Sequence, residues 1–134
     1  MKILNQKPPD LVMESCQYHF KADLSNVVFT YGDTIYNPNN GFIDEFVLAH
    51  EEVHRLQQGD NPKAWWDKYY VDPKFRLEQE LQAYRVQYRV VKAMIPERNQ
   101  VAQRLFKMAH DLSSEIYGRA VTLTEALKLI KNGI

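Results

Sequence analysis

The feature that most constrains this chain is residues 42–58, where an H-E-x-x-H sequence lies inside an apolar pattern of helical period. The apolar residues and both histidines recur at intervals of three and four, which predicts an amphipathic helix. Asp44 favours a helix start near one end and Gly59 a stop near the other. His50 and His54 are therefore predicted to project from one helix face, about one turn apart.

Two imidazoles in this arrangement can offer lone pairs to one cation, a pattern typical of zinc sites. Glu51 follows the first histidine and is the candidate general base toward a water bound to that cation. Glu52 is rotated about 100° further round the helix, so we expect a solvated charge there. The alternative is two partly buried core histidines bonded to backbone carbonyls. We favour the metal, because two neutral imidazoles buried side by side need several polar partners.

A catalytic zinc site generally has three protein ligands and one open position. No histidine lies between His54 and His110, so the third ligand has to come from another segment. Glu80 is the preferred candidate, because Ala83 shares its side of a predicted helix and a small residue lets two helices approach closely. Glu78, an aspartate and His110 are the alternatives. Glu80 can also be a surface carboxylate paired with a neighbouring side chain.

The remaining segments predict a small sheet and several helices. Residues 27–30 and Thr34–Tyr36 are β-rich on either side of a turn, which predicts a hairpin, and residues 2–5 are either a short strand or an unstructured lead. Proline and capping signals predict helices over residues 9–20, 42–58, 62–70, 73–95, 98–112 and 125–131, the last capped by Thr124. The expected fold class is α+β and mostly helical: a β-hairpin or short sheet packed on a bundle of four to five helices. Residues 1–134 are expected to form a single domain.

Composition excludes several classes of function. The chain has 17 acidic and 17 basic residues, so no overall field attracts nucleic acid or an anionic membrane. The single Cys16 excludes an internal disulfide and a cysteine-based zinc site. The N-terminal residues do not resemble a secretory signal, and no apolar run is long enough to span a membrane. We therefore expect a soluble cytoplasmic protein without nucleic-acid or membrane partners.

The H-E-E-V-H sequence at residues 50–54, combined with a later helix carrying Glu80-x-x-Ala83, resembles the gluzincin zinc metallopeptidases. The likeness is greatest to their minimal forms, the minigluzincins, and to small phage and bacterial proteins with the same helix pair. It covers about residues 27–87 as a pattern. The Trp-rich stretch between the second histidine and Glu80 is not part of the family's core motif.

The resemblance implies a zincin-like active helix with bound zinc. Carried over residue by residue, it implies His50, His54 and Glu80 as zinc ligands and Glu51 as the general base. It further implies that the strand before the active helix, here Thr34–Tyr36, is a sheet edge that pairs with an extended peptide or protein substrate.

The expected function is zinc-dependent peptide-bond hydrolysis. The alternatives are a metal-bearing but non-catalytic interaction module, of phage or regulatory type, and a helical adaptor without metal. Glu51 favours catalysis, because a purely structural site has no use for a carboxylate there. An oxyanion donor is also needed, and four side chains are candidates without one being preferred: Tyr84, Tyr88, His110 and Tyr117.

The aromatic residues of the 62–70 helix allow two interpretations. They either pack that short helix onto the core, or part of them lines the peptide cleft or a partner site. The residues concerned are Trp65, Trp66, Tyr69 and Tyr70.

Overall fold

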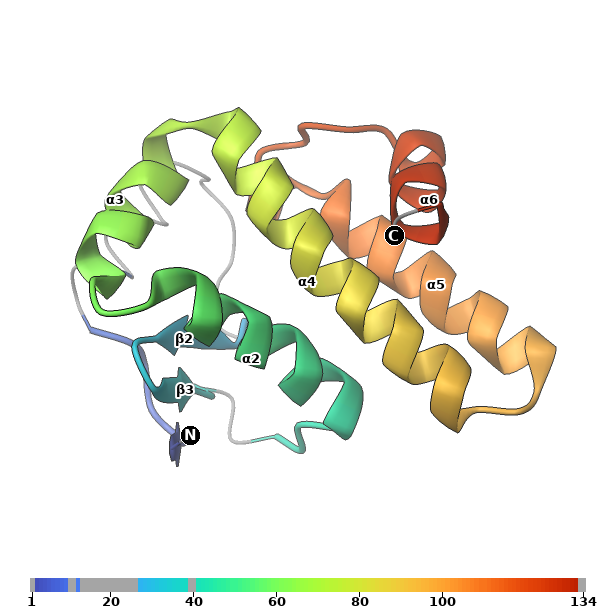
Figure 1. The fold of residues 1–134 in the computed structure, drawn as a ribbon, viewed down its shortest axis with the longest axis horizontal. Helices are drawn as coiled ribbons and strands as arrows, with labels where there is room; N and C mark the ends of the chain where they lie inside the picture. The colour runs from blue at the N-terminus through green and yellow to red at the C-terminus, as the bar shows by residue number, and fades with distance from the viewer. Residues whose placement is uncertain (1, 10–11, 13–26, 39–40, 133–134) are drawn as a thin grey trace.

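The computed structural model describes residues 2–9, 12, 27–38 and 41–132. These residues form five α-helices and a small three-stranded sheet, so the expected α+β, mostly helical fold class is confirmed (Figure 1). The strands are β1 (Lys2–Leu4), β2 (Phe29–Tyr31) and β3 (Thr34–Tyr36). The helices are α2 (Glu45–Gln58), α3 (Pro62–Val71), α4 (Pro73–Met94), α5 (Arg98–Leu112) and α6 (Leu123–Lys131), with a 3-10 helix η1 (Glu115–Tyr117). The helix expected over residues 9–20 falls almost entirely outside the described residues.

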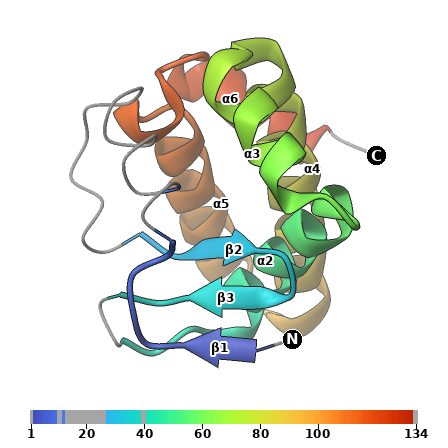
Figure 2. The same ribbon diagram turned by 90° about the vertical axis from the view of Figure 1, so that its left-hand side faces the viewer.

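The sheet has the order β1-β3-β2 (Figure 2). The predicted hairpin is confirmed: β2 and β3 are antiparallel, and Gly32 has the positive φ (63°) that its turn requires. The expectation that Thr34–Tyr36 is a sheet edge is wrong. β1 pairs with β3 in parallel, with Ile3 opposite Ile35, and so covers the side that a peptide was expected to occupy. Among the described strands, the edges are β1 and β2.

The start of α2 is fixed by a side-chain cap. The Asp44 carboxylate accepts hydrogen bonds from the backbone N–H groups of Phe46 and Val47, so the helix begins at Glu45. The expected start at residue 42 is too early, and Phe42 lies outside the helix with 94% of its surface exposed. At the other end Gly59 terminates α2 with a φ of 55°.

Proline at the first position and a capping side chain start both α3 and α4, as predicted from the sequence. The Asn61 side chain accepts from the N–H of Ala64, and the Asp72 side chain accepts from the N–H of Phe75. The expectation that Thr124 caps the last helix is wrong. Thr122 caps α6 two residues earlier, through a reciprocal capping box with Glu125.

Helix α4 lies between α2 on one side and α5 and α6 on the other (Figure 1). An apolar cluster fills the space around α4, α5 and α6, and a second, aromatic cluster joins β2 to α3. The α2–α4 contact runs between these clusters and buries polar side chains from both helices. Among the described residues, no helix combines the length and apolar character that crossing a membrane requires.

Candidate metal centre

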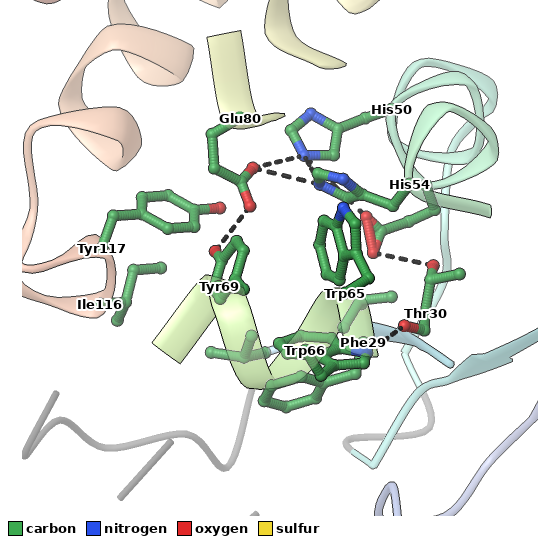
Figure 3. Close-up of a pocket in the computed structure, with 13 residues that line it drawn as sticks. Phe29, Thr30, His50, His54, Trp65, Trp66, Tyr69, Glu80, Ile116 and Tyr117 are labelled. Carbon is green, nitrogen blue, oxygen red and sulfur yellow. Dashed lines mark hydrogen bonds and ion pairs between the residues drawn. The ribbon is translucent and has the colours of Figure 1, made fainter. Parts of the chain in front are cut away.

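Three polar side chains meet at the contact between α2 and α4. His50 Nε2 lies 3.1 Å from His54 Nε2 and 3.1 Å from Glu80 Oε1, and His54 Nε2 lies 3.2 Å from the same oxygen (Figure 3). All three residues are buried, with at most 5% of their surface exposed. The structure therefore brings together the three residues that the sequence singled out as metal ligands.

The spacing of these donor atoms fits a small tetrahedral ion. Zinc–ligand bonds of about 2.0–2.1 Å at tetrahedral angles place neighbouring donor atoms about 3.3 Å apart. The three separations of 3.1, 3.1 and 3.2 Å form a nearly equilateral triangle of that size. The cluster thus matches one face of a zinc coordination tetrahedron, and its fourth corner is left for another ligand.

The cluster needs positive charge at its centre, which either protons or a metal ion can supply. Burial lowers the pKa of His54, but the charge and hydrogen bond of Glu80 outweigh burial and raise that pKa to about 9. Burial raises the pKa of the Glu80 carboxyl, yet the two histidines hold it well below its ordinary value. Two nitrogens and a carboxylate oxygen at this spacing repel one another unless positive charge lies between them.

Glu51 lies beside the cluster and is fixed by the sheet. Thr30 of β2 donates a hydrogen bond from Oγ1 to Glu51 Oε1 (3.2 Å), and Glu51 Oε2 is 4.0 Å from His50 Nε2. Burial raises the pKa of the Glu51 carboxyl, and the neighbouring histidines partly oppose that effect. Glu52, by contrast, is half exposed and pairs with Arg55 on the outer face of α2, as expected for a solvated charge.

The alternative third ligands do not reach the cluster. Glu78 is exposed on the far side of α4 from Glu80. The His110 side chain is 65% exposed, and its Nδ1 lies 3.9 Å from Asp111. Among the described residues, the only group of three or more histidine, cysteine, aspartate or glutamate side chains that is close enough to share an ion is His50, His54 and Glu80.

The cluster opens onto a small cavity of about 50 Å³ between β2, α3 and the η1 segment (Figure 3). Its walls include five aromatic side chains: Phe29, Trp65, Trp66, Tyr69 and Tyr117. A wider hollow of about 280 Å³ shares His50, Glu51 and Tyr117 with this cavity and extends toward α5. The cluster therefore stands where a narrow aromatic cavity and a broader depression meet.

The packing interpretation of the Trp-rich helix is confirmed, and a role in binding a peptide or partner stays a prediction. Trp65, Trp66 and Tyr69 belong to the buried aromatic cluster and also line the cavity, whereas Tyr70 packs there and donates its hydroxyl to the Val12 carbonyl. Tyr69 also donates a hydrogen bond to Glu80 Oε2 (2.7 Å). Tyr69 thus bonds the Glu80 oxygen that does not contact the histidines. The sequence did not predict this role of Tyr69.

Of the four candidate oxyanion donors, only Tyr84 and Tyr117 line the cavity or the hollow. Tyr88 is buried in the apolar cluster and His110 is exposed, and neither lines the cavity or the hollow. The Tyr84 and Tyr117 hydroxyls are hydrogen-bonded to each other (3.0 Å), and Tyr84 packs edge-on against the His50 ring. Burial raises the pKa of both phenols well above the ordinary value, so both keep their protons at neutral pH.

Comparison of the chain with models of protein families, with curated proteins and with solved structures finds no match. The geometry of the cluster and the residues around it therefore carry the functional argument.

Proposed function

We propose that this protein is a zinc-dependent peptidase of gluzincin type, with Glu51 as its general base. The observation that carries the proposal is the triangle of His50 Nε2, His54 Nε2 and Glu80 Oε1, with sides of 3.1–3.2 Å, buried beside a second carboxylate. These three residues would hold the zinc ion. When bound, the ion supplies a Lewis acid that polarises the scissile carbonyl and acidifies water.

Glu51 moves the proton in this proposal. Its carboxylate takes a proton from the attacking water and later gives it to the leaving amine nitrogen. Its placement suits this role, because the Thr30 hydroxyl holds Oε1 while Oε2 faces the cluster at 4.0 Å from His50 Nε2. A carboxyl with a pKa raised by burial is a stronger base than an exposed one.

Tyr117 is the donor that we assign to the developing oxyanion. The hydrogen bond between Tyr84 and Tyr117 uses one of the two phenol protons and leaves the other for a third group. Tyr117 lines both the cavity and the wider hollow, whereas Tyr84 lines the hollow alone. We infer that Tyr84 donates to Tyr117 and that Tyr117 donates to the substrate.

We propose that a peptide substrate lies along the residues just before β2. Val27 and Val28 line both the cavity and the hollow, and β2 is a sheet edge among the described strands. At Thr30 this edge is already covered, because the Thr30 carbonyl accepts hydrogen bonds from Gln58 and Trp66. An extended peptide would therefore lie beside Val28, and its pairing would end before Thr30.

One observation favours a metal-bearing interaction module without catalysis instead. A cavity of about 50 Å³ holds an ion and a few water molecules, but no large side chain. The buried Glu51 discriminates between the two functions, because a structural site gains nothing from a second buried carboxylate.

The deciding experiment compares two neighbouring glutamates on α2. Purified protein is expected to bind about one zinc per chain. Glu51→Gln is expected to keep the zinc and to lose about 10²–10⁴-fold of its peptide hydrolysis rate, whereas the outer-face control Glu52→Gln keeps both. Zinc binding without any hydrolysis by the parent chain supports the interaction module. Equal hydrolysis by the parent and Glu51→Gln contradicts the assignment of the base.

A further inference from the structure

A glutamine side chain lies against the far ring nitrogen of each histidine in the cluster. His50 Nδ1 lies 3.0 Å from Gln87 Oε1 of α4, and His54 Nδ1 lies 2.8 Å from Gln57 Oε1 of α2. Both glutamines are half-buried. Since an amide oxygen only accepts, each of these contacts requires a proton on Nδ1, so Nε2 is the ring nitrogen that would give its lone pair to a metal ion.

The orientation of the Gln57 amide is fixed by its other bonds. Its Nε2 group donates to the backbone carbonyl of Gln79 (3.0 Å) and to Gln82 Oε1 (2.9 Å), both on α4. A backbone carbonyl cannot donate, so the amide nitrogen must face Gln79 and the oxygen must face His54. Gln57 thereby links α2 to α4 and orients the His54 ring in the same contact.

These partners carry no charge. Metal-binding histidines often donate to a carboxylate, which orients the ring and also raises its basicity. Here Glu51 and Glu80 already place two buried carboxylates at the cluster, and a divalent ion would balance them. A carboxylate in place of either glutamine would add a third negative charge and would weaken the ion as a Lewis acid.

From this arrangement we infer that Gln57 and Gln87 are positioning residues that present both Nε2 lone pairs to the metal while leaving its positive charge undiminished. The inference rests on the proposed zinc site. It implies that metal affinity and hydrolysis rate can be changed in opposite directions at these two positions, which a merely space-filling role does not allow.

Gln87 is the position to test, because its only side-chain hydrogen bond within the described part of the chain is with His50, whereas Gln57 also joins the two helices. Gln87→Leu removes the acceptor, and Gln87→Glu keeps an acceptor of the same shape and adds charge. Gln103→Leu, at an exposed position on α5, is the matched control. Zinc affinity is measured by competition with a chelator. The Nδ1–H protons of the zinc-loaded protein are followed in ¹H–¹⁵N spectra.

Gln87→Leu is expected to lower zinc affinity about 10–100-fold and to shift the Nδ1–H signal of His50 while leaving that of His54 in place. Gln87→Glu is expected to restore or exceed the parent's affinity and to slow peptide hydrolysis. Parent-like affinity and an unchanged His50 signal in Gln87→Leu overturn the inference and leave the proposed function standing. A parent chain that binds no zinc overturns both.

Discussion

The two halves of α4 belong to different kinds of interior. The first half buries Arg76, Gln79 and Glu80 against α2 and α3, and each has polar partners. The second half buries Tyr88 and Val91 against the apolar faces of α5 and α6, although its Gln87 still contacts His50 of the polar site. One helix thus serves a polar site at one end and an ordinary apolar core at the other. Burial at the polar end costs stability unless every group is paired, whereas burial at the apolar end stabilises the fold directly.

If this division is correct, a change in the apolar cluster around the second half of α4 should alter stability alone. Leu112 of α5 is 1% exposed in the apolar cluster. Leu112→Ala is expected to lower the free energy of unfolding by about 2–5 kcal/mol, through lost burial and the cavity left behind. Urea unfolding measures this loss, and zinc affinity of the folded protein is expected to stay at the parent's value. A parallel loss of zinc affinity would show that the two halves are coupled.

A change of one hydroxyl at the polar site should alter the rate without altering substrate or metal binding. Tyr117→Phe is expected to lower kcat about 10²–10³-fold, with KM and zinc content unchanged, because an oxyanion donor acts only in the transition state. Tyr88→Phe removes a phenol hydroxyl from the apolar half and serves as the control. A rise in KM at constant kcat would instead make Tyr117 a substrate-binding group.

Removal of the metal tests whether the polar half depends on a cation. With free zinc at about 100 times its dissociation constant, binding is expected to add about 2.7 kcal/mol to the free energy of unfolding. Addition of a chelator should remove that increment from the parent chain. Glu80→Ala lacks one corner of the triangle, so its stability is expected to respond much less to zinc. An equal response of the two proteins would place the metal elsewhere.

The smallest expected effect concerns the start of α6, the helix that packs on the second half of α4. Thr122 caps α6 and shares a reciprocal capping box with Glu125. Thr122→Ala is expected to cost about 1 kcal/mol of unfolding free energy, as measured by urea denaturation. Thr124→Ala is the control, because Thr124 lies inside the helix and its loss should have a smaller effect. The reverse order would restore Thr124 as the cap.

Local spacing made the centre of this site predictable. His50 and His54 share a face because they lie four residues apart on one helix, and Glu80 follows from the small Ala83 on its side of the next long helix. The side chains of the capping residues Asp44, Asn61 and Asp72 likewise bond to backbone N–H groups at most three residues further along the chain. The helices that they start were therefore predictable.

Features that depend on tertiary contacts were not predictable. Thr30 and Tyr69 reach the site from β2 and α3, and no periodicity in the sequence connects them to His50 or Glu80. Gln87 shares the Glu80 side of α4 by its spacing of seven residues, but that spacing does not predict its contact with His50 on α2. The resemblance implied that β3 is a sheet edge, and the three residues of β1 are too few to show a pattern that would have placed a strand beside it; β3 lies in the centre of the sheet. The sequence did not favour Tyr117 over the other three candidates, because only the fold shows that the η1 segment lies beside the cavity.

X-ray absorption at the zinc edge is the most direct test of the central claim that one ion joins α2 to α4. The expected spectrum shows one zinc per chain with nitrogen and oxygen neighbours at about 2.0–2.1 Å, two of them imidazoles, and no sulfur. Glu80→Ala should lose the ion or change this shell. A spectrum with a sulfur neighbour or fewer than two imidazoles, or identical spectra for the parent and Glu80→Ala, would contradict the account.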